Sequence, residues 1–329
     1  MTGCPPPRKA EMQRFLARRL VFALFSVLGA TLLVFSASRL TGDPRLIYGS
    51  HSGYGMTEEQ WDALGKKLGL DKPLIVQYFI WLGHVARGDL GRQFLDGRPI
   101  IELLPTRLAA SMQLALAAWL YALIIGIPAG VVAAVKRGTF LDYLARGYAL
   151  GGMAVPHFWI GLMLILFVGQ RLGWLPTGTS GPTDVAPLSW AKIKYFIMPA
   201  MVAGWHPAAL WMRLTRSSML EILDSEYIKF ARSKGVREWV VIWKHGFKNA
   251  MIPPLTAMAM SLAGFIGHMV IVETVFSWPG MGRMAVEAIT TTDFPRLQAA
   301  VLIFSLFFIV GNFLADIAYA YIDPRIRYT

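Results

Sequence analysis

The sequence predicts an all-α integral membrane protein with six transmembrane helices. Hydrophobic residues make up 55% of the 329 residues and charged residues only 16%, against roughly 25% charged residues in a typical soluble domain. The apolar residues are gathered in stretches that approach the ~20 residues a helix needs to cross a bilayer. Charged segments separate these stretches, so the chain is expected to cross the membrane several times.

The formal net charge of +12 does not indicate a nucleic-acid-binding protein. The basic residues lie between apolar stretches, whereas a nucleic-acid-binding domain gathers them on one soluble face. Retention of cationic loops on the cytoplasmic side and contact with anionic lipid headgroups explain the charge better. The single cysteine, Cys4, excludes an internal disulfide bond and a cysteine-based metal site.

The first predicted span is Leu20–Ser38, which follows a short basic tail. A cleaved signal peptide is the alternative, but its apolar core is about 7–15 residues long, shorter than this stretch. The polar segment Arg39–Arg107 is expected to form a small extracytoplasmic subdomain. In it, Thr57–Gln60 resembles a capping box that opens a helix ending near Gly69, and Lys72–Ala86 is apolar but too short to span.

The other five spans make up the predicted five-helix core, residues 108–329, after an amino-terminal region of residues 1–107. The second span contains Gly126 and Gly130 in a small-xxx-small pattern, and prolines occur inside the second, third and fourth spans. A loop is expected over residues 277–297. The five spans are Leu108–Val135, Tyr148–Val168, Phe196–Met212, Met251–Phe276 and Gln298–Ile322.

Six spans place both termini on the same side of the membrane. The short segments on that side hold five, three, eight and two Lys/Arg, whereas the two short loops opposite hold three and two. The long first loop holds nine, but loops longer than about 60 residues translocate largely regardless of charge. We therefore expect both termini, and the segment between the fourth and fifth spans, to be cytoplasmic.

That cytoplasmic segment, Arg213–Pro254, carries eight Lys/Arg and four Asp/Glu. Its spacing predicts a helix over Ser217–Lys234 that ends at Gly235, then a second helix from Glu238 to the Pro253-Pro254 stop. A loop lying on lipid would explain the positive charge. It would not explain the exposed apolar residues Tyr227, Phe230 and Ala231, which predict a docking surface for a soluble partner.

No catalytic or phosphate-binding motif occurs in the chain, because the sequence contains no GxxxxGK[ST], GxSxG or HExxH pattern. We therefore expect no enzymatic activity and no cofactor or metal bound by this chain.

The six histidines are dispersed in the sequence. His206 and His268 fall inside spans, where polar groups often mark a transport pathway, although we favour hydrogen bonding of neutral imidazoles between helices. The same two interpretations apply to Glu273 and Asp316. The candidate pathway-lining residues are His157, His206, His268 and Glu273.

Two segments of the docking region resemble the EAA signature of ABC importer permeases. They are EYIKFARSKG, residues 226–235, and HGFKNAMIP, residues 245–253. VETVFSWPGMG, residues 272–282, and DPRIRY, residues 323–328, are similar to the first permease subunit of the dipeptide/oligopeptide/nickel importers. The similarity covers nearly the whole chain. His157-Phe158 departs from it, because a small polar residue is expected after Pro156.

The resemblance implies a type I ABC importer permease in the cell inner membrane. It implies a homologous second permease subunit, an extracytoplasmic substrate-binding protein, and two cytoplasmic ATP-binding subunits that bind ATP and Mg²⁺. The ATPase-coupling residues would be Glu226, Tyr227, Phe230, Ala231, Lys234 and Gly235.

Peptides are the expected substrates under this resemblance, with nickel chelates or glutathione-like solutes as the alternative. A stand-alone secondary transporter would predict an inverted repeat and charges at mid-membrane, and the sequence has no such repeat and few such charges. A membrane scaffold would leave the docking surface without a role.

Overall fold

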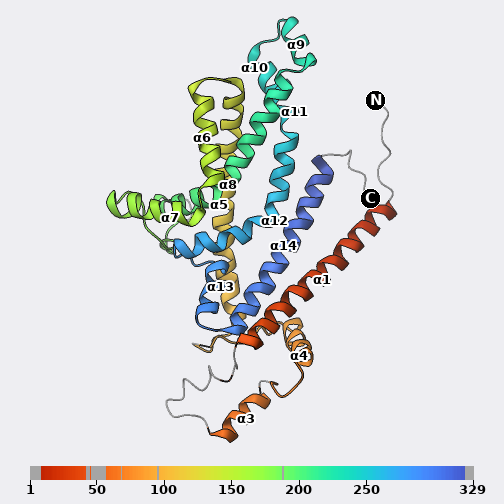
Figure 1. Cartoon of the computed structure of the whole chain (residues 1–329), viewed down its shortest axis with the longest axis vertical. Helices are drawn as coiled ribbons and strands as arrows, with labels where there is room; N and C mark the ends of the chain where they lie inside the picture. Colours follow the sequence, from red (N-terminus) through yellow and green to blue (C-terminus); the bar gives the residue numbers. More distant parts are fainter. Residues whose placement is uncertain are drawn as a thin grey trace. The chain divides into compact units, whose positions relative to one another are not determined.

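The computed structural model describes residues 9–41, 45, 57–67, 69–94, 96–186 and 189–322 (Figure 1). In this part of the chain the structure is helical apart from one isolated bridge between Arg92 and Pro99, which confirms the all-α class. Two short stretches, η1 and η2, are π-helical. The helices are α1 Lys9–Thr41, α3 Glu58–Lys67, α4 Leu74–Ala86, α5 Ile100–Val135, α6 Phe140–Ala154, α7 His157–Leu164, η1 Ile165–Arg171, α8 Trp190–Leu223, α9 Glu226–Ser233, α10 Glu238–Val240, η2 Val241–Phe247, α11 Lys248–Ala250, α12 Ile252–Val275, α13 Met281–Thr290 and α14 Phe294–Ile322.

The described residues pack as two units, and the long helices α5 and α14 belong to both. The first unit holds the residues up to Ala109 together with Gly280–Ile309, and the second holds Ala110–Pro279 with the rest of α14. The predicted boundary at residue 107 lies close to the border at Ala109. Residues 280–309, which we assigned to the permease core, pack instead with the amino-terminal unit.

Three described helices are long and apolar enough to cross a membrane: Val21–Leu40 of α1, α5, and Phe294–Ala315 of α14. A fourth span is possible if α6 and the segment His157–Arg171 count as one broken span. The predicted fourth and fifth spans correspond to α8 and α12, whose 34 and 24 residues are long enough to cross. The prediction of six spans therefore includes α8 and α12 on the basis of their length.

The predicted third span is wrong as a single helix. The chain bends by 110° between α6 and α7, because Pro156 lacks an N–H group and its ring pushes the preceding residue out of the helical region. Val155 is accordingly extended, with φ −88° and ψ 128°. Each of the two segments is about 15 residues long, so neither crosses a bilayer alone.

The amino-terminal unit confirms the predicted capping box. The backbone N–H of Gln60 donates to Thr57 Oγ1, and the backbone N–H of Thr57 donates to Gln60 Oε1 at 3.2 Å. The short apolar helix α4 packs on α1, where the hydroxyls of Tyr78 and Thr31 lie 2.9 Å apart and the rings of Tyr78 and Phe35 meet edge to face.

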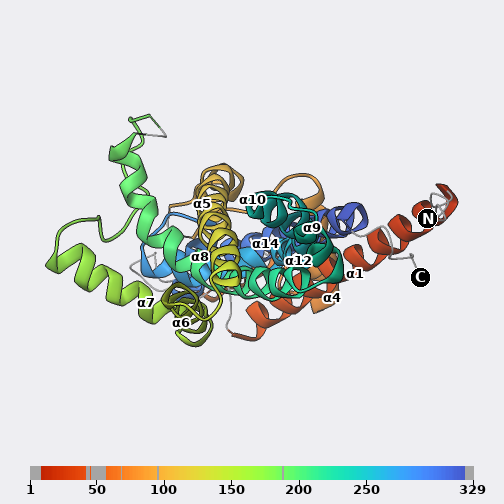
Figure 2. The ribbon, with the colours of Figure 1, turned by 90° about the horizontal axis from the view of Figure 1, so that it is seen from above.

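Helix α8 packs closely against three helices of the second unit: α5, α6 and α12 (Figure 2). Glycines allow its approach to α5. A Cβ atom on Gly126 would lie 2.7 Å from the carbonyl oxygen of Ala208, and one on Gly130 would lie 2.7 Å from that of Met212. The small-xxx-small pattern therefore marks a real helix contact, of the kind expected in a membrane.

Asp142, near the start of α6, ties that helix to α8. Its side chain is 1% exposed, and its Oδ1 accepts from Arg216 Nε at 2.7 Å while its Oδ2 accepts from Arg216 Nη2 at 3.0 Å. The backbone N–H of Gly138 donates to the same carboxylate at 3.0 Å. This two-point pair holds the carboxyl-terminal part of α8, which leads into the predicted docking region.

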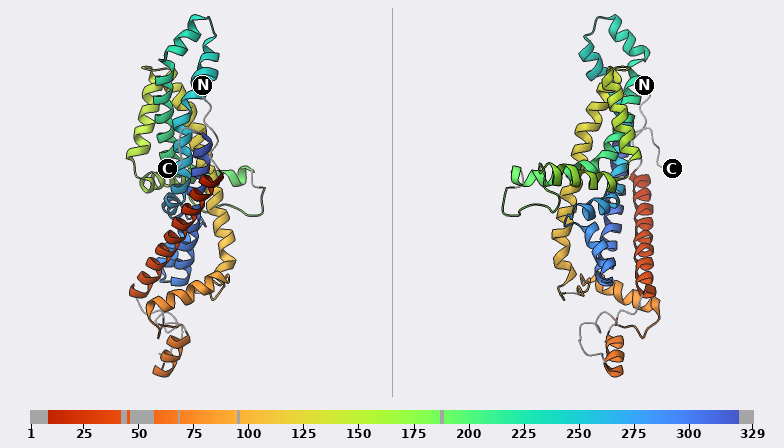
Figure 3. Two further views of the ribbon diagram at one scale, coloured as in Figure 1. Left: turned by 90° about the vertical axis from the view of Figure 1, so that its right-hand side faces the viewer. Right: turned by 60° about the vertical axis from the view of Figure 1, so that its left-hand side comes forward.

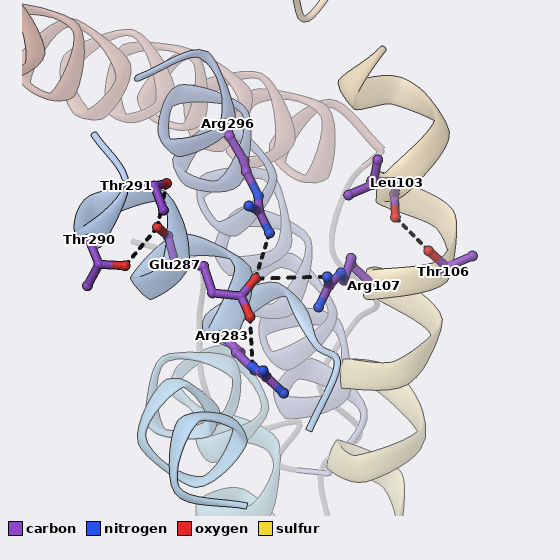
Figure 4. Close-up of polar contacts among 8 residues, drawn as sticks. All are labelled: Leu103, Thr106, Arg107, Arg283, Glu287, Thr290, Thr291 and Arg296. Carbon is purple, nitrogen blue, oxygen red and sulfur yellow. Dashed lines mark hydrogen bonds and ion pairs between the residues drawn. The ribbon is translucent and has the colours of Figure 1, made fainter. Parts of the chain in front are cut away.

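The predicted loop over residues 277–297 is wrong, because it contains the helix α13 and the start of α14. Glu287 stabilises this corner of the first unit by pairing with three guanidinium groups (Figure 4). Its oxygens lie 2.8 Å from Arg283 Nε, 2.6 Å from Arg296 Nη2 and 3.9 Å from Arg107 Nη2. We read the Trp, Pro and Gly residues as loop signals and overlooked the i,i+4 pair of Arg283 and Glu287.

The side chain of Asp316 lies outside the described residues, as do the first eight residues with Cys4 and the carboxyl-terminal residues 323–329.

Replacing Gly126 with alanine is expected to destabilise the protein by about 1–3 kcal/mol, because the new methyl group would overlap the backbone of Ala208. The measurement is the thermal unfolding midpoint of the purified full-length protein. Gly147→Ala is the matched control: it also lies in a helix, with no atom within 4 Å of where its Cβ atom would stand, so it should gain up to about 1 kcal/mol. Equal midpoints for Gly126→Ala and wild type would contradict the close contact.

Replacing Glu287 with glutamine is expected to cost about 1–3 kcal/mol, because three arginines then lose a common charged acceptor. Hydrogen exchange of the α13 amides should increase in the variant. Glu59→Gln, on the exposed side of α3, serves as the control and should stay within about 0.5 kcal/mol of wild type. Unchanged exchange in α13 would argue against a stabilising role for the cluster.

Candidate functional site

The predicted docking helix begins after a break in the chain. We expected one helix over Ser217–Lys234, but α8 ends at Leu223 and α9 starts at Glu226. Ser225 between them is extended, with φ −72° and ψ 152°, and its hydroxyl donates to the carbonyl of Ile222 at 2.5 Å. Serine competes in this way with helical backbone hydrogen bonds, so the prediction of a continuous helix was wrong at this point.

The carboxyl end of α9 follows the prediction. Lys234 is the last residue with near-helical backbone, and Gly235 has φ +76°, in the left-handed region that favours glycine. No atom lies within 4 Å of where a Cβ atom of Gly235 would stand. Glycine is therefore required at position 235 by its left-handed backbone conformation, and not by a lack of space within this chain.

Two opposite faces distinguish α9. Ile228 is fully buried and anchors the helix, whereas Tyr227 is 42% and Phe230 is 60% exposed. Ala231, one residue further, is partly exposed. The apolar residues predicted to face water therefore do so in this chain, and α9 lies beyond the end of α8 (Figure 3).

Charged pairs surround the exposed face of α9. Glu226 pairs with Lys229 at 2.8 Å, and the ammonium of Lys234 lies 4.4 Å from the centre of the Phe230 ring. Arg232 donates to both oxygens of Glu238, at 2.7 and 3.2 Å. This hydrogen bond lowers the pKa of the Glu238 carboxyl, so the pair is ionised at neutral pH and its contribution is lost as the pH falls through that lowered pKa.

A hydrogen-bonded link connects α9 to the helices that follow. Asn249 Nδ2 donates to the Tyr227 hydroxyl at 3.1 Å and to the carbonyl of His245 at 3.0 Å. Tyr227 itself donates to the same carbonyl at 3.4 Å. Tyr227 thus presents its ring outward and fastens α9 to η2 and α11 through its hydroxyl.

The second helix of the docking region begins at Glu238 as predicted, and the backbone stays helical through α10, η2 and α11 to Ala250. The predicted stop at Pro253-Pro254 is wrong, because both prolines lie in the first turn of α12. Proline is tolerated there because the first N–H groups of a helix have no intrahelical acceptor.

Sequence reasoning missed the aromatic residues of this segment. Trp239 is 69% and Trp243 is 39% exposed, and the rings of Trp239, Trp243 and Phe247 form a ladder with centroids 5.2 Å apart at each step. Their spacing of four residues was the available signal, because such residues lie on one face of a helix.

The structure gathers three histidines that are distant in the sequence. His157 begins α7, His206 lies in α8 and His268 lies in α12. The ring centroid of His157 lies 5.8 Å from that of His206 and 6.3 Å from that of His268. The Nδ1 of His206 is 3.2 Å from the carbonyl oxygen of Gly152, and since a carbonyl only accepts, this nitrogen donates.

Glu273 lies near the end of α12. Its side chain is fully buried, and its Oε1 accepts a hydrogen bond from the Ser111 hydroxyl at 2.5 Å. The neighbouring Trp278 donates to the carbonyl of Ala110 at 2.9 Å. These contacts join α5 to the end of α12 and give Glu273 a packing role within this chain; lining a pathway stays a prediction.

Among the described residues, no group of three or more His, Cys, Asp or Glu is arranged to hold a metal ion. The chemistry of the second unit therefore lies in two places: the exposed surface of α9 with the following aromatic ladder, and the histidine cluster formed by α7, α8 and α12.

Comparison with known proteins agrees with this architecture. Residues 126–328 match the family described as binding-protein-dependent transport system inner membrane component. A chain of the MetNI methionine ABC transporter, solved in inward-facing conformations, has a similar fold: TM-score 0.53 and 14% identity, covering 67% of this chain and 96% of that one.

Curated relatives extend over almost the whole chain. The dipeptide transport system permease protein DppB of Alkalihalophilus pseudofirmus is 37% identical, covering 96% of this chain and all of the relative. The oligopeptide transport system permease protein AppB of Bacillus subtilis is 36% identical with the same coverage. The glutathione transport system permease protein GsiC of Escherichia coli is also 36% identical.

These matches, with the apolar helices, identify a multi-pass inner-membrane protein. The chain belongs to the family of binding-protein-dependent transport system inner membrane components, the permeases of ABC importers, and within it resembles the dipeptide and oligopeptide permeases.

Proposed function

We propose that this chain is one of two permease subunits of an ATP-driven importer for di- or oligopeptides. The observation that carries the proposal is the exposed apolar surface of α9, where Tyr227 and Phe230 face water beyond the end of α8. An exposed patch of this kind marks a binding surface. The near full-length relatives named for dipeptides and oligopeptides support the substrate class.

The proposed partners follow from the lack of a phosphate-binding loop in the sequence and from the exposed surface of α9. The chain carries no phosphate-binding loop, so ATP and Mg²⁺ would be bound by two separate cytoplasmic ATP-binding subunits, one of them on α9. A homologous second permease would complete the pathway, and an extracytoplasmic binding protein would deliver the substrate. The Lys/Arg distribution supports cytoplasmic termini, with α9 on the same side.

The contacts of α9 explain how a partner could move the spans. The ATPase would press on Tyr227, Phe230 and Ala231, while Glu226, Lys234 and Gly235 shape the two ends of the helix. Buried Ile228 and the link from Tyr227 to Asn249 pass the motion to η2, α11 and α12. The ATPase must bind two states of this surface with different affinity, because equal affinity shifts no equilibrium.

The histidine cluster supports a pathway role for α7, α8 and α12. Polar rings from three helices meet in the second unit, and intramembrane polar groups commonly face a substrate route. We infer that His157, His206 and His268 line that route. A glutathione-like solute is the second candidate substrate, favoured by the relative GsiC.

Transport by the assembled complex tests the proposal directly. The chain, co-expressed with the permease, ATPase and binding-protein genes beside its own, is placed in liposomes, and ATP-dependent uptake of a labelled dipeptide is measured. We expect uptake only with all partners present. Uptake of the same dipeptide by this chain alone would overturn the proposal in favour of a stand-alone transporter.

Gly235→Val and Ala231→Glu should each uncouple ATP hydrolysis from transport. The first places a β-branched residue at φ +76°, and the second adds a charge to the apolar surface. We expect the ratio of peptide imported to ATP hydrolysed to fall at least about tenfold, which corresponds to about 1.4 kcal/mol of lost coupling.

Gly138→Val is the matched control for Gly235→Val, since Gly138 also has a positive φ, +79°, in a turn after a helix, with no atom near its Cβ position. Ala231→Ser is the conservative control for the second variant. Normal coupling in both test variants, with the protein inserted at wild-type level, would remove α9 as the docking helix.

A further inference from the structure

An apolar cavity opens between α5 and the segment that follows α9. Its volume is about 300 Å³, and it is lined by five residues of α5 and two of η2. The lining side chains are Leu123, Ile124, Ile127, Pro128, Val131, Trp243 and Phe247. Because none of these side chains offers a charge or a carboxyl, amide or hydroxyl group, the cavity suits a hydrocarbon occupant.

The depth of the cavity matches one leaflet of a bilayer. Helix α5 ends at Val135 and is followed by Lys136 and Arg137. At 1.5 Å per residue, the lining from Val131 to Leu123 lies roughly 8 to 20 Å along the helix from Lys136. One leaflet of hydrocarbon is about 15 Å thick, so the part of the lining nearer Lys136 lies at the depth of acyl chains below that basic end.

Aromatic residues of η2 border the cavity on one side. Trp243 lies at its wall, and the ladder continues through Trp239, which is 69% exposed. Tryptophan favours the boundary between headgroups and acyl chains because its ring is apolar and its N–H is polar. The π-helical turn of η2, an uncommon conformation that often occurs at functional sites, positions Trp243 and Phe247 on this wall.

Four exposed cations lie close in the chain to the lining residues: Lys136 and Arg137 follow the end of α5, and Lys244 and Lys248 lie in or next to η2. Two of them, Lys244 and Lys248, directly follow the lining residues Trp243 and Phe247 in the chain. In the described part of the chain none of the four forms an ion pair, whereas the basic residues of α9 pair with Glu226 and Glu238. Unpaired lysines at this depth attract anionic headgroups.

We propose that this cavity is a binding site for an anionic glycerophospholipid. One acyl chain fills the space between α5 and η2, the glycerol region lies against Trp243, and the phosphate contacts Lys244 and Lys248. The bound lipid would wedge α5 against the segment that carries α9.

Photolabelling tests the site in the full-length protein, extracted from the membrane in polymer discs with whatever subunits accompany it. The probes are phosphatidylglycerol and phosphatidylcholine with a diazirine on the acyl chain, and adducts are located by peptide mass spectrometry. We expect phosphatidylglycerol to label the peptides that contain Ile124 and Trp243.

Ile124→Trp should reduce this labelling at least about fivefold, because Ile124 is 63% exposed at the edge of the cavity and indole would occupy it. In the double variant Lys244→Gln and Lys248→Gln, the ratio of labelling by phosphatidylglycerol to labelling by phosphatidylcholine should fall about thirtyfold. This is the effect expected of two lysines near the membrane surface. Leu150→Trp is the control: Leu150 is 70% exposed on α6 and does not line the cavity, so labelling at Ile124 should be unchanged.

A photoreactive amino acid at position 124 identifies a competing occupant. Cross-linking of that residue to another polypeptide, with no lipid adduct, would overturn the proposal and assign the cavity to a subunit interface. Equal labelling by both lipids in the wild-type protein would equally contradict it, since the lysines would then have no part in recognition. The labelling does not depend on transport, so its outcome is separate from that of the proposed importer function.

Discussion

Backbone-to-backbone contact between helices is the constraint on which the second unit depends. Lipid tails are as apolar as the side chains that face them, so burying leucine between two helices gains little in a membrane, and close packing with interhelical hydrogen bonds must hold them together. Helix α8 meets this requirement through Gly126 and Gly130 on α5, where a single added carbon would overlap the main chain. The buried pair of Asp142 and Arg216 fixes α6 to the same helix. A rigid α8 is what allows its far end to present α9 at a defined position.

Breaks in the helices are the second feature that shapes this unit. Pro156 turns the chain through 110° between α6 and α7, and the same bend brings His157 next to His206 and His268. The break at Ser225 separates α9 from α8, so α9 can be displaced without unwinding the span before it. A short covalent connection joins the two helices, and the hydrogen bond between Asn249 and Tyr227 fastens α9 to the segment that follows it.

Polar groups in this protein are used where apolar contacts cannot specify geometry. Glu287 holds three arginines at one corner of the first unit, and Glu273 joins α12 to α5 through Ser111. At α9, by contrast, Glu226 and Glu238 pair with Lys229 and Arg232, and the Lys234 ammonium lies over the Phe230 ring. The cations near η2 have no such partners in the described chain. This difference separates a surface suited to a protein from one suited to anionic lipid.

The sequence by itself determined the helical class, the apolar stretches, the capping box at Thr57, the glycine contact of α5 and the end of α9 at Gly235. All of these depend on residues close together in the chain, whose periodicity or conformational preference is local. Only the tertiary structure decided the rest. It broke the third span at Pro156 and the docking helix at Ser225, because whether a proline or serine kinks or ends a helix depends on what packs around it. It also formed α13, buried Glu273, and gathered His157, His206 and His268 from three helices, since residues that are 49 and 62 positions apart in the sequence carry no local signal of their proximity.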